Sequence, residues 1–560
     1  MSGELKRLKD PLYGYITIPE EYVNNIIDTA PFQRLRRVTQ TSYAPLYPSS
    51  VHNRFVHSLG VYHLGCLASE RIKAEITKLE IKTRFCIEKY CKLFVLACLL
   101  HDAGHSPFSH VGEKFFIDDE PGREYERLHK LLINEAGSRK SFVKDIPKDS
   151  SRSAAPHEIM SAIIGIKEYG VMLDKLDESE GREFFARCIT GYTYSNRDTD
   201  SDIKNCFISL LNSKVIDVDK LDYLLRDAYI TGFDTISIDY NRLIGSITIA
   251  AEKEHYRIAY YKSAVSVIEN VVYAHDAERK WIQNHPVVLY EAYILRRVID
   301  ALSGHLDSDD KKLFSSEALS RKGQRFNHGI KISLLCDDDI IFLMKNGDFR
   351  ELGALSEEFF DRKTRRHPIW KSESEYKAYI LDLDSDISLV EDFEAIMTET
   401  AKYLSKATTD GVIDDALIAK FESELKEIES IDIPDIDEES KEIQIKNKKL
   451  ILEVMKSLKA YSSDNGIECS FVILEARQFT SGFGKPDFAN INIVFRTSAE
   501  DKLATVDKIV SSIQAKAKEN DRDTFFYIFY KRKNGSEKLD SKDFCEKLYM
   551  KIKNLHKDRI

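Results

Sequence analysis

The chain has 560 residues and a net charge of -10 at pH 7, so it can hold two or three domains with sizeable cores but offers no generally basic surface to nucleic acid. Its nine cysteines form no CxxC pair and several fall within apolar runs, which predicts reduced, buried thiols in a cytoplasmic protein. The first residues do not resemble a signal peptide and no apolar stretch approaches membrane-spanning length, so we expect no membrane association.

Helical patterns dominate the first half of the chain. Residues 54–72, 83–100 and 213–230 each repeat apolar residues at the spacing of an α-helix. The second run ends where Gly104 and Pro107 break the pattern. Three separate helices that carry polar residues predict a bundle in which those polar groups converge, and a fold class that is mainly α.

The pattern changes from about residue 241. Residues 243–250 and 255–262 alternate like two strands joined by a polar turn, and residues 265–302 return to helical spacing. Residues 408–449 are acidic and poor in aromatic side chains. That composition predicts an acidic linker or a charged helix.

The C-terminal part is expected to form a small α+β lobe. It combines apolar runs at 469–479, 490–496, 525–533 and 544–552 with a helix-like segment at 499–519. We therefore predict four parts, namely a core at 1–310, a helical or mixed extension at 311–407, the acidic linker or charged helix at 408–449 and the C-terminal lobe at 450–560.

Two histidines and two aspartates in apolar helical surroundings form a candidate metal-ligand set: His57, the adjacent pair His101 and Asp102, and Asp219. Each residue alone is more often a core or surface residue than a ligand. Their order along the chain, each with a matching flank, favours a divalent metal site. Mixed nitrogen and oxygen ligands suit manganese or iron best, with magnesium, nickel or zinc as alternatives.

Such a site predicts phosphoester hydrolysis, because a divalent cation can polarise a phosphoryl oxygen and assist attack by water. His105, His110, Glu113 and His157 are the candidate catalytic residues around it. A histidine can protonate a leaving oxygen, and a carboxylate can orient that histidine. The alternative for these residues is a supporting role that only orients the metal ligands.

Five segments carry a family resemblance: 11–40, 52–65, 99–113, 156–164 and 216–232. In this order they resemble the motifs of the HD-domain deoxynucleoside triphosphate triphosphohydrolases, which include bacterial dGTPases and the vertebrate sterile-alpha-motif and HD-domain enzyme. The match becomes thin beyond Gly232. It implies an HD-domain helical bundle as the phosphohydrolase core, with the positions of His110 and Glu113 beside the scissile bond and that of His157 lining the same site.

The resemblance also implies substrate contacts. Arg54 and Lys220 bring positive charge beside the candidate metal ligands, where a triphosphate would lie. Tyr223 and Asp227 follow the last ligand at one-turn intervals on the same helix face. In the family, the matching tyrosine packs against the sugar, and the matching aspartate, with the position of Gln40, holds the 3′ hydroxyl. Ordinary core packing is the alternative for Tyr223.

A candidate activator site lies in the segment IIDTAPFQRLRR. Asp28, Gln33 and Arg36 match residues that bind an activating guanine nucleotide in the vertebrate enzyme. An amphipathic helix with surface charges is the alternative. Members of this family form homo-oligomers, commonly tetramers or hexamers, so the resemblance implies an oligomer here.

The expected function is metal-dependent hydrolysis of dNTPs, dGTP or a broad set, to deoxynucleoside and inorganic triphosphate. Activation by a guanine nucleotide is part of this expectation, whereas the base preference stays open. Two alternatives remain: another HD-type nucleotide phosphohydrolase or phosphodiesterase, and a catalytically silent nucleotide-sensing or nucleic-acid-binding protein. The acidic composition and the complete ligand set disfavour the silent protein.

Overall fold

The computed structural model describes residues 4–117, 120, 122–233, 237–252, 255–306, 314–347, 349, 352–381, 387–408, 411–430, 438–477, 483, 485–496, 501–518, 524–533 and 538–557. The chain forms two compact units. The first unit comprises Met1–Arg279, Ile299–Asp348 and Thr480–Asn520, and the second comprises Lys280–Val298, Phe349–Phe479 and Asp521–Ile560. Among the described residues, no helix combines the length and the apolar character needed to cross a membrane.

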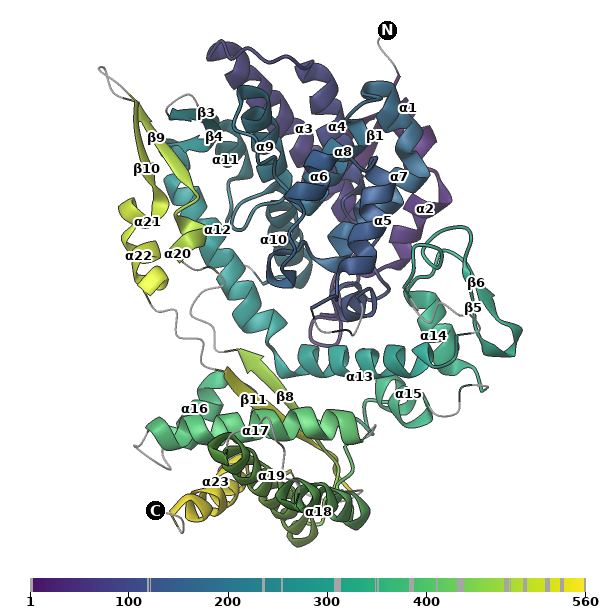
Figure 1. The fold of residues 1–560 in the computed structure, drawn as a ribbon, viewed down its shortest axis with the longest axis vertical. Coiled ribbons are helices and arrows are strands. Elements are labelled where there is room, and N and C mark those ends of the chain that lie inside the picture. The colour runs from purple at the N-terminus through teal and green to yellow at the C-terminus, as the bar shows by residue number, and fades with distance from the viewer. Residues whose placement is uncertain are drawn as a thin grey trace. The chain divides into compact units, whose positions relative to one another are not determined.

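The first unit is mainly helical (Figure 1), which confirms the predicted fold class. Its longer helices are α3 (Arg54–Lys78), α4 (Ile87–Leu100), α5 (Glu126–Ala136), α7 (Pro156–Leu176), α8 (Gly181–Thr190), α9 (Thr199–Leu211), α10 (Val218–Thr231) and α12 (Val265–Glu278). Helix α3 packs against α4 and α10, and α7 packs against α5 and α8. The three predicted helices are thus confirmed as α3, α4 and α10, although α10 begins later than the apolar pattern suggested.

Short helices connect or follow these elements. They are α1 (Glu20–Tyr22), η1 (Val23–Ile27), α2 (Ala30–Gln33), η2 (Arg34–Arg37), η3 (Ser109–Phe115), α6 (Lys140–Asp145), η4 (Ser150–Arg152), α11 (Tyr240–Gly245), η5 (Lys262–Ala264), η7 (Asn327–Gly329) and α14 (Asp337–Lys345). The 3-10 helix η3 begins at a sharp change of direction, because Phe108 and the first helical residue, Ser109, have φ angles of 55° and 54° in the left-handed region. After this change of direction η3 contacts α7.

Local sequence explains how the helices that carry the candidate ligands begin and meet. Asn53 caps α3 by accepting from the backbone N–H of Val56, and Asp217 caps α10 by accepting from that of Lys220. Gly60 on α3 lies so close to α10 that an added Cβ would be 1.8 Å from Oδ1 of Asp222. Only glycine permits this approach, which brings α3 and α10 together at His57.

The described residues of the first unit form three sheets. Strands β1 (Leu5–Asp10) and β2 (Gly14–Pro19) form a hairpin, and β5 (Gln324–Arg325) pairs with β6 (Lys331–Ile332). The third sheet has the order β10-β9-β4-β3, built from β3 (Ile247–Glu252), β4 (His255–Tyr261), β9 (Asn492–Arg496) and β10 (Asp501–Thr505). In Figure 1, the yellow-green hairpin of β9 and β10 lies beside β4. The two predicted strands at 243–250 and 255–262 are confirmed as β3 and β4, except that residues 243–245 of the first prediction belong to helix α11.

The predicted helix at 499–519 is wrong in its first part. Asp501–Thr505 is strand β10, and helices α21 (Val506–Ile509) and α22 (Ser511–Lys518) follow, while α20 (Lys485–Phe488) precedes β9. Leu503 faces Val494 across the antiparallel pair and packs against the small cluster around Ala259. Pairing with β9 supplies both hydrogen bonds and burial, which outweigh the local helical preference. Residues 499–500 and 519 of the predicted helix lie outside the described residues, as do residues 478–479 of the apolar run predicted at 469–479.

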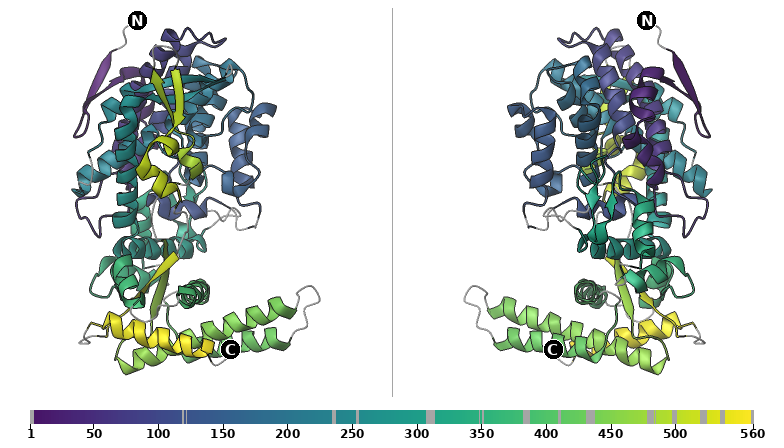
Figure 2. Two further views of the ribbon diagram at one scale, coloured as in Figure 1. Left: turned by 90° about the vertical axis from the view of Figure 1, so that its left-hand side faces the viewer. Right: turned by 90° about the vertical axis from the view of Figure 1, so that its right-hand side faces the viewer.

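The second unit contains a three-stranded sheet of order β7-β11-β8. Its strands are β7 (His367–Pro368), β8 (Phe471–Arg477) and β11 (Thr524–Tyr530), and its helices are α15 (Gly353–Phe360), α16 (Glu373–Leu381), α17 (Ile387–Ala407), α18 (Asp415–Ser430), α19 (Glu438–Asp464) and α23 (Ser541–Lys557). The π-helix η6 (Arg279–Gln283) and α13 (Pro286–Ser303) run across the division between the units. Most of the described part of the acidic stretch is helical, because residues 415–430 form α18 and residues 438–449 belong to α19, the green helical hairpin of Figure 2. Residues 411–414 precede α18 and are not helical.

The strands of the predicted C-terminal lobe join two different sheets. β8 and β11 lie in the second unit, whereas β9 and β10 extend the sheet of β3 and β4 in the first. The four predicted parts of the chain therefore stay a prediction about domains, and the compact units divide the chain in another way.

Candidate active site

The four candidate metal ligands meet at one point in the first unit. We call His57, His101, Asp102 and Asp219 the metal-ligand cluster. Nε2 of His57 lies 2.9 Å from Oδ1 of Asp219 and 3.2 Å from Nε2 of His101. Nε2 of His101 lies 3.5 Å from both Asp102 and Asp219. Helix α3, the end of α4 and the first turn of α10 each contribute to the cluster.

The donor atoms of the cluster fit a divalent cation. Nδ1 of His57 donates to Oδ2 of Asp222 over 2.7 Å, and Nδ1 of His101 donates to the carbonyl oxygen of Cys98 over 2.9 Å. With both Nδ1 atoms engaged, Nε2 is the atom that each histidine can offer to a cation. Imidazoles held in this way by a second hydrogen bond are typical of metal sites.

The electrostatics of the cluster also favour positive charge at its centre. Burial disfavours a charged His57, but hydrogen bonds to Asp219 and Asp222 outweigh burial and raise its pKa to about 9. The pKa of Asp219 is held well below its usual range, because hydrogen bonds to His101 and His57 outweigh burial. The carboxylates are thus ionised at neutral pH, and a metal cation is the natural species to balance them.

Asp222 is a supporting residue that the sequence analysis did not identify. It lies three residues after Asp219 on α10, which places both carboxylates on one helix face. Besides His57, its carboxylate binds Oη of Tyr13 at 2.7 Å and the guanidinium of Arg226 at 3.0 Å. Arg226 in turn donates to Asp10 at 3.0 Å. A buried network therefore connects the N-terminal hairpin to a metal ligand.

We expect Asp222→Asn to weaken metal retention about 10- to 100-fold, because an amide cannot match the charge that orients His57. Metal content after gel filtration and the activity regained on titration with Mn²⁺ measure this loss. Tyr13→Phe is the matched control, since it removes one bond to Asp222 and leaves the bond to His57 intact. An Asp222→Asn protein that binds metal as tightly as the wild type would contradict the positioning role.

The four candidate catalytic residues form a second group, which we call the acid–base cluster: His105, His110, Glu113 and His157. Their donor atoms lie within 4.8 Å of one another. Glu113 accepts a short hydrogen bond from Nδ1 of His110 and forms an ion pair with Nδ1 of His157 at 2.7 Å. His105 stacks on His157 with ring centroids 4.2 Å apart. The structure therefore brings together residues that are up to 52 positions apart in the sequence.

The charged groups of the acid–base cluster shift the pKa values of one another. Burial disfavours ionised Glu113, but His157 and His110 hold the pKa of its carboxyl well below the usual range. Burial likewise opposes a charged His157, yet Glu113 raises its pKa to about 9. Burial and the neighbouring cations Arg54 and His157 keep the pKa of His105 well below 6.5. At neutral pH the cluster thus holds an ionised carboxylate between histidines.

Arg54 links the two clusters. Its Nη1 donates to Oδ2 of Asp102 at 2.8 Å, and its Nη2 lies 3.4 Å from Nε2 of His110. Lys220 donates to the carboxylate of Asp217 at 2.7 Å and to the carbonyl oxygen of Ser213 at 2.9 Å. Both predicted phosphate contacts therefore adjoin the metal-ligand cluster, one through Asp102 and one through its sequence neighbour Asp219.

The predicted sugar contacts lie on α10 and before α3. Tyr223 is half-buried, and Asp227 is buried. Oδ1 of Asp227 lies 2.6 Å from Nε2 of His52, a residue that the sequence analysis did not single out. Gln40 pairs with His52 only through the backbone, and its side-chain Oε1 is buried without a hydrogen-bond partner among the described residues. An unpaired buried acceptor of this kind is a candidate ligand contact.

Of the three candidate activator residues, Asp28 and Arg36 are exposed and Gln33 is half-buried. Nε of Arg36 donates to Oε1 of Gln33 at 2.8 Å, and the guanidinium stacks over Phe55 at 3.6 Å from the ring centroid. Asp28 is within 3.9 Å of Lys6 on the N-terminal hairpin. Whether this surface binds a nucleotide stays a prediction.

Comparisons with known proteins point to the same segment. The HD domain family matches residues 54–176, which include three members of the metal-ligand cluster. The chain is 29% identical over 282 residues to "Deoxynucleoside triphosphate triphosphohydrolase SAMHD1 homolog" of Dictyostelium discoideum, covering 48% of this chain and 46% of that protein. It is 33% identical over 246 residues to "Deoxynucleoside triphosphate triphosphohydrolase SAMHD1" of Gallus gallus, covering 43% and 36%.

Other similar proteins add the fold. The chain is 29% identical over 265 residues to "Uncharacterized protein MG461" of Mycoplasma genitalium, covering 47% of this chain and 52% of that protein. The chain thus spans about half the length of the curated relatives it matches. A crystal structure of a hypothetical protein from Aquifex aeolicus covers 98% of this chain and 100% of its own, with a TM-score of 0.53 and 20% identity, which shows a shared fold alone.

Proposed function

From the premise that the chain carries an HD domain and resembles the HD-domain dNTP triphosphohydrolases, we propose that it hydrolyses dNTPs to deoxynucleoside and inorganic triphosphate. The observation that carries this proposal is the arrangement of the two clusters. Arg54 contacts Asp102 of the metal-ligand cluster with one nitrogen and approaches His110 of the acid–base cluster with another. A phosphate chain placed beside Arg54 would meet the metal ligands and a proton donor together.

The metal-ligand cluster would hold the cation. Manganese or iron suits its two imidazoles and two carboxylates best, with magnesium, nickel or zinc as alternatives. A bound divalent cation would supply Lewis-acid stabilisation of the phosphoryl group. Asp222 and the carbonyl oxygen of Cys98 hold the two histidines in orientation for it.

His110 is the proposed acid that protonates the leaving 5′ oxygen. Its Nδ1 is held by Glu113, so Nε2 is the atom that faces Arg54 and the phosphate. An ionised Glu113 stabilises the charged imidazolium from which the proton would come. His157 binds the same carboxylate and lines the site, and His105 packs behind it, so these two residues act through Glu113 and the shape of the cluster.

Arg54 and Lys220 are the proposed phosphate contacts, and Tyr223, Asp227 and Gln40 the proposed sugar contacts. Burial of the ring raises the pKa of Tyr223 well above its ordinary value, so the phenol stays neutral beside Glu278 and Asp219. A ring packed against C2′ would exclude ribonucleotides on steric grounds. Asp227, held by His52, would accept from the 3′ hydroxyl.

Product analysis tests this function. We expect Mn²⁺-loaded protein to convert at least one dNTP to deoxynucleoside and intact triphosphate, because Arg54 and Lys220 hold the phosphate chain while attack occurs at the α-phosphorus. Each dNTP and each NTP is incubated separately, and chromatography separates triphosphate, pyrophosphate and phosphate. Chelated protein without added metal is the control. Deoxynucleoside monophosphate and pyrophosphate as first products, or GTP turnover as fast as that of dGTP, would contradict the assignment.

Guanine-nucleotide activation is a further part of the proposal. Asp28, Gln33 and Arg36 would read the base, and binding there would favour an active homo-oligomer, a tetramer or hexamer, in the cytoplasm. A ligand shifts such an equilibrium only by its differential affinity for the assembly states. The same residues must therefore control assembly and turnover together.

We expect added GTP or dGTP to increase the mass seen by light scattering and to raise turnover of dATP or dCTP in the wild type. Asp28→Ala should lose both effects, since it removes the carboxylate that would pair with the base. Lys6→Ala is the matched control, because it breaks the 3.9 Å ion pair and keeps that carboxylate. Unchanged mass and turnover in the wild type would refute the activator site and leave the catalytic proposal standing.

A further inference from the structure

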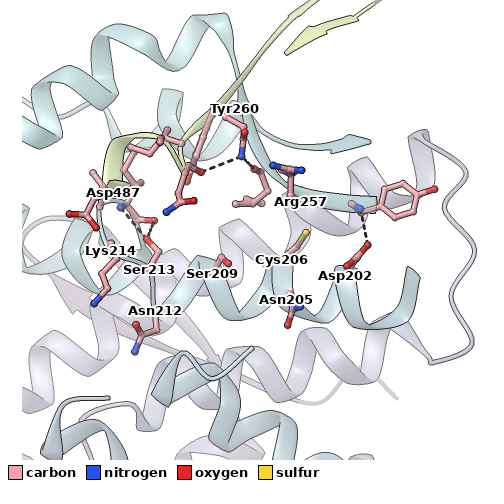
Figure 3. Close-up of a pocket in the computed structure, with 18 of the residues that line it drawn as sticks. Asp202, Asn205, Cys206, Ser209, Asn212, Ser213, Lys214, Arg257, Tyr260 and Asp487 are labelled. Carbon is pink, nitrogen blue, oxygen red and sulfur yellow. Dashed lines mark hydrogen bonds between the residues drawn. The ribbon is translucent and has the colours of Figure 1, made fainter. Parts of the chain in front are cut away.

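A cavity of about 500 Å³ lies in the first unit, and its lining contains none of the candidate site residues. It is bounded by α9, by the segment between α9 and α10, by β4, and by residues 487–492, which lead into β9 (Figure 3). In that view Ser209 and Cys206 of α9 line the middle, with Asn212, Ser213 and Lys214 towards one end and Asp202 towards the other. Its volume is that of a site for a small molecule.

The charges around this cavity favour an anion. Three cationic side chains line it, namely Arg197, Lys214 and Arg257. Arg197 and Lys214 are exposed, and within the described part of the chain neither forms an ion pair. Of the two acidic residues in the lining, Asp202 already accepts from the backbone N–H of Tyr256 at 3.0 Å and pairs with His255 at 3.2 Å. Positive charge therefore predominates among the groups that can meet a ligand.

The other residues that line the cavity suit a polar organic group attached to that anion. Ser209, Asn490 and Asn492 offer hydroxyl and amide groups, while Tyr256 offers a half-buried ring. Phosphate groups are recognised by arginine and lysine, and flat polar bodies by rings and amides. A phosphorylated molecule of nucleotide size combines both.

One wall of the cavity is bonded directly to the candidate active site. Ser213 lines the cavity, its N–H donates to Oδ2 of Asp217 at 3.0 Å, and its carbonyl oxygen accepts from Lys220 at 2.9 Å. Asp217 caps the helix that carries Asp219. A ligand that moves Ser213 would therefore change how Lys220 is held.

We propose that this cavity binds a phosphorylated small molecule of nucleotide size and that its occupancy alters substrate binding through Ser213 and Lys220. The proposal of a binding site is argued only from the cavity and the charges that line it, whereas the proposed effect on substrate binding rests on the proposed function.

Calorimetric titration of the full-length chain in chelator tests the binding site. The probes are 5′-AMP and inorganic triphosphate, which separate a nucleoside phosphate from a free polyphosphate anion. We expect Arg197→Ala/Lys214→Ala to weaken binding of at least one probe about tenfold or more, because two charged contacts are lost. Lys89→Ala/Lys92→Ala removes the same charge from exposed positions on α4 and should bind like the wild type. Ser209→Phe, which fills the cavity without changing charge, should also weaken binding.

Failure of both probes to bind, or equal affinity in the cavity and control variants, would overturn the binding site. Turnover then tests the coupling. We expect the bound probe to change the KM for dNTP in the wild type and in Lys89→Ala/Lys92→Ala, but not in Arg197→Ala/Lys214→Ala. A bound probe that leaves KM unchanged would overturn the coupling and leave the site intact. Absence of any dNTP turnover would refute the proposed function, and the titration would still decide the binding site.

Discussion

Asp219→Asn should reduce metal retention and dNTP hydrolysis by about 10²-fold or more, while the fold is preserved. The effect is large because this carboxylate faces Nε2 of both ligand histidines, at 2.9 Å from His57 and 3.5 Å from His101. The side chain is 32% exposed, so its amide can be solvated at little cost to folding. Metal content after gel filtration, turnover with Mn²⁺ restored and the thermal unfolding midpoint are measured together.

Replacing His101 and Asp102 together by alanine should abolish both metal retention and hydrolysis. Helical content should stay close to that of the wild type, because α4 ends at Leu100, before either residue. This double variant is the less clean test, since Asp102 pairs with buried Arg54 and loss of one partner of a buried ion pair costs about 3–5 kcal/mol. Asp219→Asn avoids that cost.

Glu178→Gln is a matched control, because it neutralises an exposed carboxylate on the same unit. It should keep metal, turnover and unfolding midpoint at wild-type values. Should Asp219→Asn retain both its metal and its turnover after chelation and reloading, the metal-ligand cluster would not be the cation site.

The sequence was sufficient to propose the metal ligands, because their chemistry is visible in residue types and order. His57, His101 and Asp102 each sit in or at the end of a strongly periodic helix, and such helices are the most predictable elements of a chain. A helical bundle by itself predicts that these ligands meet, so no distance between them had to be known. The resemblance to a known family added the acid–base cluster, because the spacing of its four residues alone would not have grouped them into one site.

The supporting residues could not be predicted in the same way. Asp222 holds His57 only because Gly60 lets α3 and α10 approach closely, and that contact joins residues 165 positions apart. The i, i+3 spacing from Asp219 was the one available signal. His52 was missed for a similar reason, since its pairing with Asp227 spans 175 positions.

The sheet that joins strands from the middle of the chain to strands near its end could also not be predicted from the sequence. Tyr260 pairs with Ile493 in a parallel register that no local pattern encodes. Asp501–Thr505 then becomes a strand because β9 is already placed beside it. Pairings between distant segments depend on the finished fold and not on propensity.

Glu113→Gln should lower turnover about 10²- to 10⁴-fold with little change in metal content. Its carboxylate accepts from His110 and pairs with His157, so a neutral amide would no longer stabilise the imidazolium that donates the proton. Metal content separates this effect from loss of a ligand, because the metal-ligand cluster does not include Glu113. His129→Gln, a half-buried histidine bonded to Tyr192, is the control for a change near the cluster.

The same variant should change how stability depends on pH. In the wild type the pKa of His157 is raised from 6.5 to about 9, so its protonated form adds stability fully below pH 6.5 and loses it as the pH rises through about 9. Without the charge of Glu113 that raised pKa should disappear, and the unfolding midpoint of Glu113→Gln should fall less between pH 7 and pH 9.5 than that of the wild type. Equal slopes in the two proteins, or unimpaired turnover in the variant, would show that Glu113 does not hold the histidines as the structure places them.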